Sequence, residues 1–221
     1  MEIQEQNYST KLLRPAPSIY KSSDLELISI VTAWGDGESK ENINSEINKF
    51  LFAAKGDFEV TSPFEFNLSL TKDSNSLRMA TLIANDNVYR TENKDDIKTC
   101  YELLILFKNK NQLSWLQVGN PNIILLRDGV TPVSYGPPTL QSKDKKNILL
   151  PSQFFGIEMH CYFQVGSMEI QDNDRLLLFT GNDLAPESWS LRGEEQSLGR
   201  FFKNQIKFKS DNPFWMATVR V

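Results

Sequence analysis

Hydrophobic residues gather in short stretches along most of the chain, many of them alternating with polar positions, a pattern typical of β-strands. We expect strands at residues 25–32, 50–54, 101–107, 113–118, 123–127, 156–165, 175–180 and 214–221. The stretch 50–54 (FLFAA) is wholly apolar and is followed by Gly56. Residues 109–111 and 127–129 have the composition of hairpin turns, and the second contains Asp-Gly. The second half of the chain is therefore predicted to consist of consecutive antiparallel strands.

Two stretches favour helices. Residues 61–99 show an interrupted helical spacing of apolar residues, with Pro63 in a first turn behind a Ser62 cap and breaks at 85–87 and 91–96. Residues 187–205 form the second candidate helix. Helices and hairpins in separate parts of the chain predict an α+β layered domain. We place this domain at residues 25–221, behind a loosely packed lead-in of residues 1–24 whose later part pairs as an edge strand.

Composition narrows the class of protein. The 221 residues are 40% hydrophobic and 24% charged, which is ordinary for a globular domain, and the net charge of −4 argues against a general nucleic-acid binder. No apolar run is long enough to span a bilayer. The two cysteines, Cys100 and Cys161, are expected to be free thiols without a structural disulfide. These features predict a cytoplasmic protein.

The chain has a single histidine, His160, in an alternating run that is expected to be a strand. Multi-histidine metal sites are excluded, and Ser-His-Asp or Cys-His catalysis would depend on this one residue. A structural or surface role is the expectation for His160.

Five segments, taken in order, resemble the metal-dependent serine/threonine phosphatases of the PP2C (PPM) family, with details of the SpoIIE/RsbU branch. They are 32–44 (TAWGDGESKENIN), 51–57 (LFAAKGD), 113–129 (LSWLQVGNPNIILLRDG), 170–187 (IQDNDRLLLFTGNDLAPE) and 210–221 (SDNPFWMATVRV). The resemblance implies an α-β-β-α sandwich of two antiparallel sheets flanked by helices. It also implies hydrolysis of phosphoserine or phosphothreonine esters by two Mn²⁺ or Mg²⁺ ions bridged by a water.

Most acidic positions of that metal centre are substituted in this sequence. By the resemblance, the degenerate positions are Asn44, Lys55, Gly181 and Asp211, of which only Asp211 keeps an acid. Lys55 falls where an aspartate would bridge the two ions, and an ammonium there would repel both. We therefore expect no catalytic residue and no metal cofactor. The further hypothesis is that the Lys55 ammonium pairs with a buried Asp211.

An alternative stays open. Asp57 and Asp183 each lie two residues beyond a substituted position, so that two β-bulges could rebuild a two-metal site from Asp57, Asp183 and Asp211. Further acids that could add to this site are Asp36, Glu38, Glu41 and Glu46. The protein would then be a divergent Mn²⁺- or Mg²⁺-dependent phosphoserine/phosphothreonine phosphatase.

The favoured interpretation is a catalytically degenerate PP2C-like domain, a pseudophosphatase that works as a protein-binding or regulatory module. Its partner is expected to be a protein, with no nucleic acid and no membrane involved. Candidate contacts at the former active-site rim are Trp34, Asn120, Asn122 and Trp189, although core packing is the commoner role of a tryptophan.

Overall fold

The chain divides into two compact units, each built around one sheet. The computed structural model describes residues 1–221 except 24–25, 37–39, 57–63, 136–152 and 182. The terminal unit contains Met1–Ala16, Asn120–Pro151 and Ile170–Val221, and the central unit contains Pro17–Gly119 and Ser152–Glu169. Each unit holds a five-stranded sheet in which every neighbouring pair is antiparallel. The predicted α+β class with two antiparallel sheets is confirmed.

The sheet of the central unit has the strand order β2-β3-β4-β5-β8. Its strands are β2 (Ser18–Lys21), β3 (Leu27–Gly35), β4 (Thr99–Asn109), β5 (Gln112–Val118) and β8 (Gln164–Glu169). The predicted hairpin turn at 109–111 joins β4 to β5, with Lys110 in the left-handed region at φ +55°. Strand β2 is the predicted edge strand of the lead-in.

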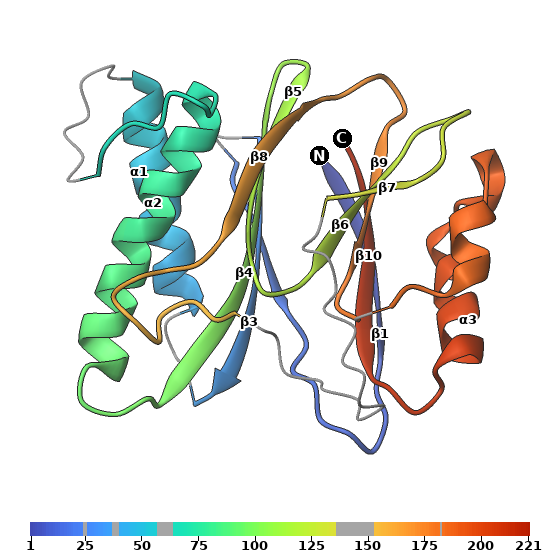
Figure 1. Cartoon of the computed structure of the whole chain (residues 1–221), viewed down its shortest axis with the longest axis horizontal. Helices are drawn as coiled ribbons and strands as arrows, with labels where there is room; N and C mark the ends of the chain where they lie inside the picture. The colour runs from blue at the N-terminus through green and yellow to red at the C-terminus, as the bar shows by residue number, and fades with distance from the viewer. Residues whose placement is uncertain (24–25, 37–39, 57–63, 136–152, 182) are drawn as a thin grey trace. The chain divides into compact units, whose positions relative to one another are not determined.

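Helices pack on one face of this sheet (Figure 1). They are α1 (Lys40–Gly56), α2 (Lys72–Val88) and a π-helical turn, η1 (Tyr89–Asn93). In α1 the buried residues Ile43, Ile47 and Leu51 recur every fourth position and form a single stripe. The core that they join is completed by α2 and the strands, with Leu77, Ala80, Ala84, Val88, Val31, Leu103, Ile105 and Leu116.

The sheet of the terminal unit has the order β1-β10-β9-β6-β7. Its strands are β1 (Glu2–Tyr8), β6 (Asn122–Leu126), β7 (Val133–Ser134), β9 (Arg175–Phe179) and β10 (Phe214–Arg220). Helix α3 (Leu198–Phe208) lies on one face of this sheet, preceded by the 3₁₀ turns η2 (Pro186–Ser190) and η3 (Gly193–Glu195) (Figure 1). Phe201 of α3 is fully buried against Leu177, Phe179 and Met216.

The strand predicted at 50–54 is wrong. These residues belong to the last turns of α1, with Leu51 and Ala54 buried and Phe52 exposed. An apolar run of five residues is too short to separate a strand from a buried helix segment, and the four-residue spacing of Ile43, Ile47 and Leu51 is the signal that decides for a helix.

The strand predicted at 156–165 is wrong for most of its length, because β8 begins only at Gln164. The backbone of Gly156 and Glu158 bonds to side chains instead of to a neighbouring strand. Asn85 accepts from the Gly156 N–H at 2.8 Å and donates to the Glu158 carbonyl at 2.8 Å, and Asn93 donates to the Gly156 carbonyl at 2.7 Å. His160 therefore lies in a bent segment and is exposed.

Other boundaries also differ. Residues 2–8, expected to be loosely packed, form β1 and pair with β10 along their whole length. The helix predicted at 187–205 is split into η2, η3 and α3, and the helix predicted from residue 63 begins at Lys72 behind a Thr71 cap. Ser62 and Pro63 lie outside the described residues. The division into a lead-in and a single domain of residues 25–221 stays a prediction.

Candidate functional site

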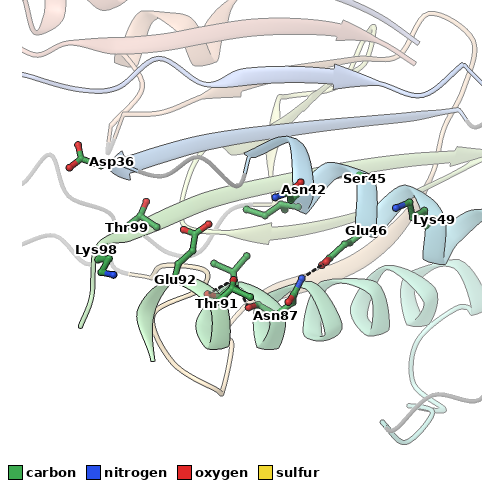
Figure 2. A pocket seen from close by; sticks show the side chains of 12 residues that line it. Asp36, Asn42, Ser45, Glu46, Lys49, Asn87, Thr91, Glu92, Lys98 and Thr99 are labelled. Carbon is green, nitrogen blue, oxygen red and sulfur yellow. Dashed lines mark hydrogen bonds between the residues drawn. The ribbon is translucent and has the colours of Figure 1, made fainter. Parts of the chain in front are cut away.

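The central unit contains a pocket of about 710 Å³ between α1, the end of α2, η1 and the first residues of β4. We call it the helix-end pocket (Figure 2). It is lined by Asp36, Asn42, Ile43, Ser45, Glu46, Lys49, Asn87, Val88, Thr91, Glu92, Lys98 and Thr99. Asp36, directly after β3, and the first turns of α1, which begins at Lys40, both contribute to this lining.

Gly35, the last residue of β3, has a backbone conformation that favours glycine. Its φ of +96° lies in the region that residues other than glycine rarely adopt. A Cβ at this position would also stand 2.5 Å from the carbonyl oxygen of Lys98. Asp36 lies next to it at the pocket, at the point where β3 ends.

Two of the three acidic residues that line the helix-end pocket are glutamates that accept hydrogen bonds. Glu46 of α1 accepts a hydrogen bond through Oε1 from Asn87 of α2, as the dashed line in Figure 2 shows. Its Oε2 is buried and has no hydrogen-bond partner among the described residues. Partial burial raises the pKa of Glu46, against the hydrogen bond from Asn87 and the charge of Lys49. Glu92 of η1 accepts from the buried Tyr101 hydroxyl at 3.0 Å.

Two threonine hydroxyls of the pocket lining keep acceptor sites. Thr91 and Thr99 donate their hydroxyl hydrogens to the backbone carbonyls of Asn87 and Trp34, at 2.9 Å and 3.2 Å, which leaves oxygen lone pairs available. The two lysines of the lining are exposed. Within the described part of the chain, no three His, Cys, Asp or Glu side chains stand close enough to hold a metal ion. The pocket lining therefore combines carboxylate, hydroxyl and amide groups with two exposed lysines.

The structure changes the assignment of the Asp-Gly segment. Residues 51–57 were compared with an apolar strand that runs into Asp-Gly, but residues 51–56 are helical. Lys55 lies in the last turn of α1, where the helix dipole favours a cation, and not at a strand end. The strand that does run into Asp-Gly is β3, followed by Asp36 and Gly37. The Lys55 side chain and Asp57 lie outside the described residues.

Asn44 also belongs to α1 and not to a strand or turn. Its side chain accepts a hydrogen bond from Ser29 of β3 and another from Asn48 at 3.0 Å. These contacts tie the helix to the sheet, which gives Asn44 a structural role.

Most of the remaining predicted site residues come together at one end of the terminal sheet. Strand β6 starts there and β9 ends there, since Asn122 pairs with Phe179. Asn122 donates from Nδ2 to the Gly181 carbonyl at 3.3 Å. Asn120 is half-buried just before β6, and Asp211 precedes β10 at the same end.

The two aspartates at this end are not arranged as a pair. Asp183 forms an ion pair of 2.6 Å with Lys209, and the main chain beside it is held by Gln205, whose Nε2 donates to the Asp183 carbonyl at 3.1 Å. Asp211 is exposed. The expectation that Asp211 is buried is therefore wrong, because solvent stabilises its charge. Its pairing with Lys55 stays a prediction, since the Lys55 side chain lies outside the described residues.

The two tryptophans proposed as contacts are both half-buried. Trp34 donates from Nε1 to the buried carboxylate of Glu102 at 3.1 Å. Trp189 packs against the core of the terminal unit that contains Phe201. Each tryptophan therefore has a structural role, and only part of its side chain is accessible to a partner.

The cysteines are free, and burial raises the pKa of Cys100 to about 11 and that of Cys161 to about 12. Neither is a reactive thiolate at neutral pH. No helix in the described ranges combines the length and the apolar character that a membrane crossing requires.

Comparison with known proteins identifies the fold. No protein-family model matches the chain, and no curated protein matches it. Among solved structures it is similar to PppA, a regulatory component of T6SS in Pseudomonas aeruginosa, with 13% identity, a TM-score of 0.65 and coverage of 99% of this chain and 96% of that one.

Two mycobacterial phosphatases have the same fold. The PPM Ser-Thr phosphatase MsPP from Mycobacterium smegmatis is 11% identical, with a TM-score of 0.60 and coverage of 100% and 98%. The phosphatase PstP from Mycobacterium tuberculosis is 13% identical, with a TM-score of 0.57 and coverage of 98% and 97%. The chain has a PP2C-like fold, two five-stranded antiparallel sheets with flanking helices, as the resemblance implied.

Proposed function

We propose that this PP2C-like chain is a pseudophosphatase, a protein-binding or regulatory module that does not use a two-metal centre. The observation that carries the proposal is the environment of the two aspartates at the end of the terminal sheet. Asp183 is neutralised by Lys209, and Asp211 is exposed without a hydrogen bond or ion pair from another described residue. A fold that keeps its framework while its acids are placed in this way is expected to act through its surface.

The donor set does not fit two divalent cations. Mn²⁺ and Mg²⁺ require several oxygen ligands, mainly carboxylates, around each ion. The described residues do not offer three such ligands together at any point, and the glutamates of the helix-end pocket are each held by a neutral donor. The solved PstP catalytic domain holds two manganese ions, but it is only 15% identical to this chain. Metal binding by this chain is therefore argued from its own residues.

A protein is the proposed partner, and the cytoplasm the proposed compartment. The net charge of −4 does not favour nucleic acid. Asn120 and Asn122, at the end of the terminal sheet, stay proposed contacts together with the exposed edges of Trp34 and Trp189. The SpoIIE/RsbU branch of the family stays a proposal as well.

A phosphatase assay tests the proposal. Hydrolysis of p-nitrophenyl phosphate is measured with excess Mn²⁺ or Mg²⁺ for the full chain and for Asp36→Asn, Asp183→Asn and Asp211→Asn. Asp86→Asn is the matched control, since Asp86 lies on α2 in an exposed ion pair with Arg90. We expect no turnover above the metal-only blank in any of these proteins. Metal-dependent turnover that Asp211→Asn abolishes and Asp86→Asn retains would overturn the proposal.

One observation favours the second candidate, a divergent metal-dependent phosphatase. Strand β3 ends immediately before Asp36 and Gly37, which is the strand-into-Asp-Gly arrangement of the family. Asp36 would then take the ligand role proposed for Asp57, which lies outside the described residues. In that case Asp36→Asn would remove turnover together with Asp211→Asn, and metal analysis of the purified protein would find bound Mn²⁺ or Mg²⁺.

A further inference from the structure

Helix α3 exposes a row of cations. Arg200, Lys203 and Lys207 are all exposed, and their spacing of three and then four residues places them on one side of the helix. They span about 10 Å along the helix axis at 1.5 Å per residue. The helix contains no acidic residue. We call Arg200, Lys203 and Lys207 the α3 basic row.

The α3 basic row differs from four other cations of the same unit, Arg127, Arg175, Arg192 and Lys209. Arg127 forms a bidentate ion pair with Asp174, and Lys209 an ion pair with Asp183. Arg175 and Arg192 donate to backbone carbonyls, at 3.0 Å to Gln196 and at 2.9 Å to Trp189. By contrast, no ion pair or side-chain hydrogen bond joins the α3 basic row to any other described residue. The charges of these three residues are therefore not neutralised by ion pairs with the described residues.

Arg200 does not stabilise its own helix. It is the third residue of α3, in the first turn, where the helix dipole disfavours a cation. The sequence Ser197-Leu198-Gly199-Arg200 has the spacing of a capping box, S-x-x-E, but carries arginine where glutamate would bond back to the cap. The Ser197 side chain makes no capping hydrogen bond. Helix stability therefore gives no reason for this charge.

We propose that the α3 basic row is a docking surface for an acidic segment of a partner protein. The inference rests on the proposed function, that the domain acts by binding, and it names the surface and the chemistry of the partner. Charge complementarity argues for this occupant, because three unpaired cations in one row on a chain of net charge −4 attract an acidic segment to that face. The other face of α3 is buried against the terminal sheet through Phe201, so only the charged side is available.

The experiment measures binding of a fluorescent helical peptide with glutamates at i, i+3 and i+7, by anisotropy in low-salt buffer. The full chain is compared with the Arg200→Glu/Lys203→Glu/Lys207→Glu variant. The control is Lys11→Glu/Lys21→Glu/Lys94→Glu, which has the same net charge and changes three exposed lysines elsewhere. A second probe peptide carries glutamine in place of glutamate.

We expect the α3 variant to lose at least about tenfold in affinity for the glutamate peptide and the control variant to keep wild-type affinity. The glutamine peptide should bind weakly, and added salt should release the glutamate peptide. Circular dichroism of both variants verifies that each is folded, and the single variant Arg200→Glu, which completes the capping box, tests binding without loss of helix stability. Equal losses in both triple variants would overturn the proposal, because net charge alone would then explain binding.

Absence of binding to the glutamate peptide would overturn it as well, and so would α3-dependent binding to phosphatidylglycerol vesicles or duplex DNA in its place. Failure of this surface is distinguishable from failure of the proposed function. Phosphatase turnover would overturn the latter and leave the peptide result unchanged, whereas loss of peptide binding would say nothing about turnover.

Discussion

At the scale of single residues, the ion pair of Asp174 and Arg127 is the best defined electrostatic contact of the terminal unit. Asp174 is 1% exposed and accepts two hydrogen bonds from Arg127, at 2.9 Å and 2.7 Å, and a third from the backbone N–H of Gln171 at 2.9 Å. Burial acts to raise the pKa of Asp174, but these hydrogen bonds and the arginine charge outweigh it and lower the pKa. The carboxylate therefore stabilises the fold when ionised.

Asp174→Asn is expected to lower the free energy of unfolding at neutral pH by about 3 kcal/mol, because it leaves the arginine without its counter-charge. Since the folded pKa lies below 3.8, the difference from wild type is present above that pH and disappears as the pH falls through the folded value. Urea denaturation at pH 7 and at pH 3 measures both effects. Asp86→Asn, in an i,i+4 pair with the exposed Arg90, is the control and should cost much less. A loss in Asp174→Asn that matched this control would show that the buried pair does not stabilise the unit.

The pKa of Glu46 is shifted in the opposite direction from that of Asp174. Burial raises the pKa of Glu46 in the folded chain, so stability is lost as the pH rises from the ordinary value of 4.5 towards the folded pKa. Glu46→Gln keeps an acceptor for Asn87 and removes the charge. We expect a higher denaturation midpoint than wild type at pH 7 and no difference at pH 4. Glu158→Gln, at an exposed position, should change neither value. An unchanged midpoint for Glu46→Gln at pH 7 would contradict the burial argument.

At the scale of elements, the start of α3 is the clearest place where local sequence and local structure disagree. Arg200 stands where a glutamate would complete a capping box with Ser197. Arg200→Glu is expected to raise the free energy of unfolding by about 0.5 to 1 kcal/mol, by capping and by a favourable dipole interaction. Lys203→Glu makes the same change of charge in the middle of the helix and should be near neutral. Thermal melting of both variants checks this, and a destabilised Arg200→Glu would refute it.

Helix α1 shows how an element can be misread. Its apolar stripe of Ile43, Ile47 and Leu51 is visible in the sequence, yet the run at 50–54 suggested a strand. The buried amides Asn85 and Asn93 act similarly on the segment after Phe155, since they take backbone hydrogen bonds that a strand would have given to its neighbour. Hydrogen bonds from side chains distant in sequence take the place of the strand pairing that the local alternation predicts.

At the scale of the whole molecule, the proposed absence of a two-metal centre has a thermodynamic consequence. A ligand that binds only the folded state raises its apparent stability by mass action. We therefore expect the melting temperature to be the same with excess Mn²⁺, with excess Mg²⁺ and with EDTA. Differential scanning fluorimetry measures this directly. A rise with Mn²⁺ that EDTA reverses, and that Asp211→Asn removes, would contradict the proposal.

The sequence by itself determined the α+β class and most strands of the second half, because strand periodicity and turn residues are local properties of the chain. Its resemblance to the PP2C family implied the PP2C-like fold. Only the tertiary structure decided that 50–54 is helical, that β3 is the strand that runs into Asp-Gly, that Asp183 is bound to Lys209 and that Asp211 is exposed. The reason is physical. Whether an acid is free, paired or in solvent depends on side chains that meet only after folding, and Asp183 and Lys209 are 26 residues apart.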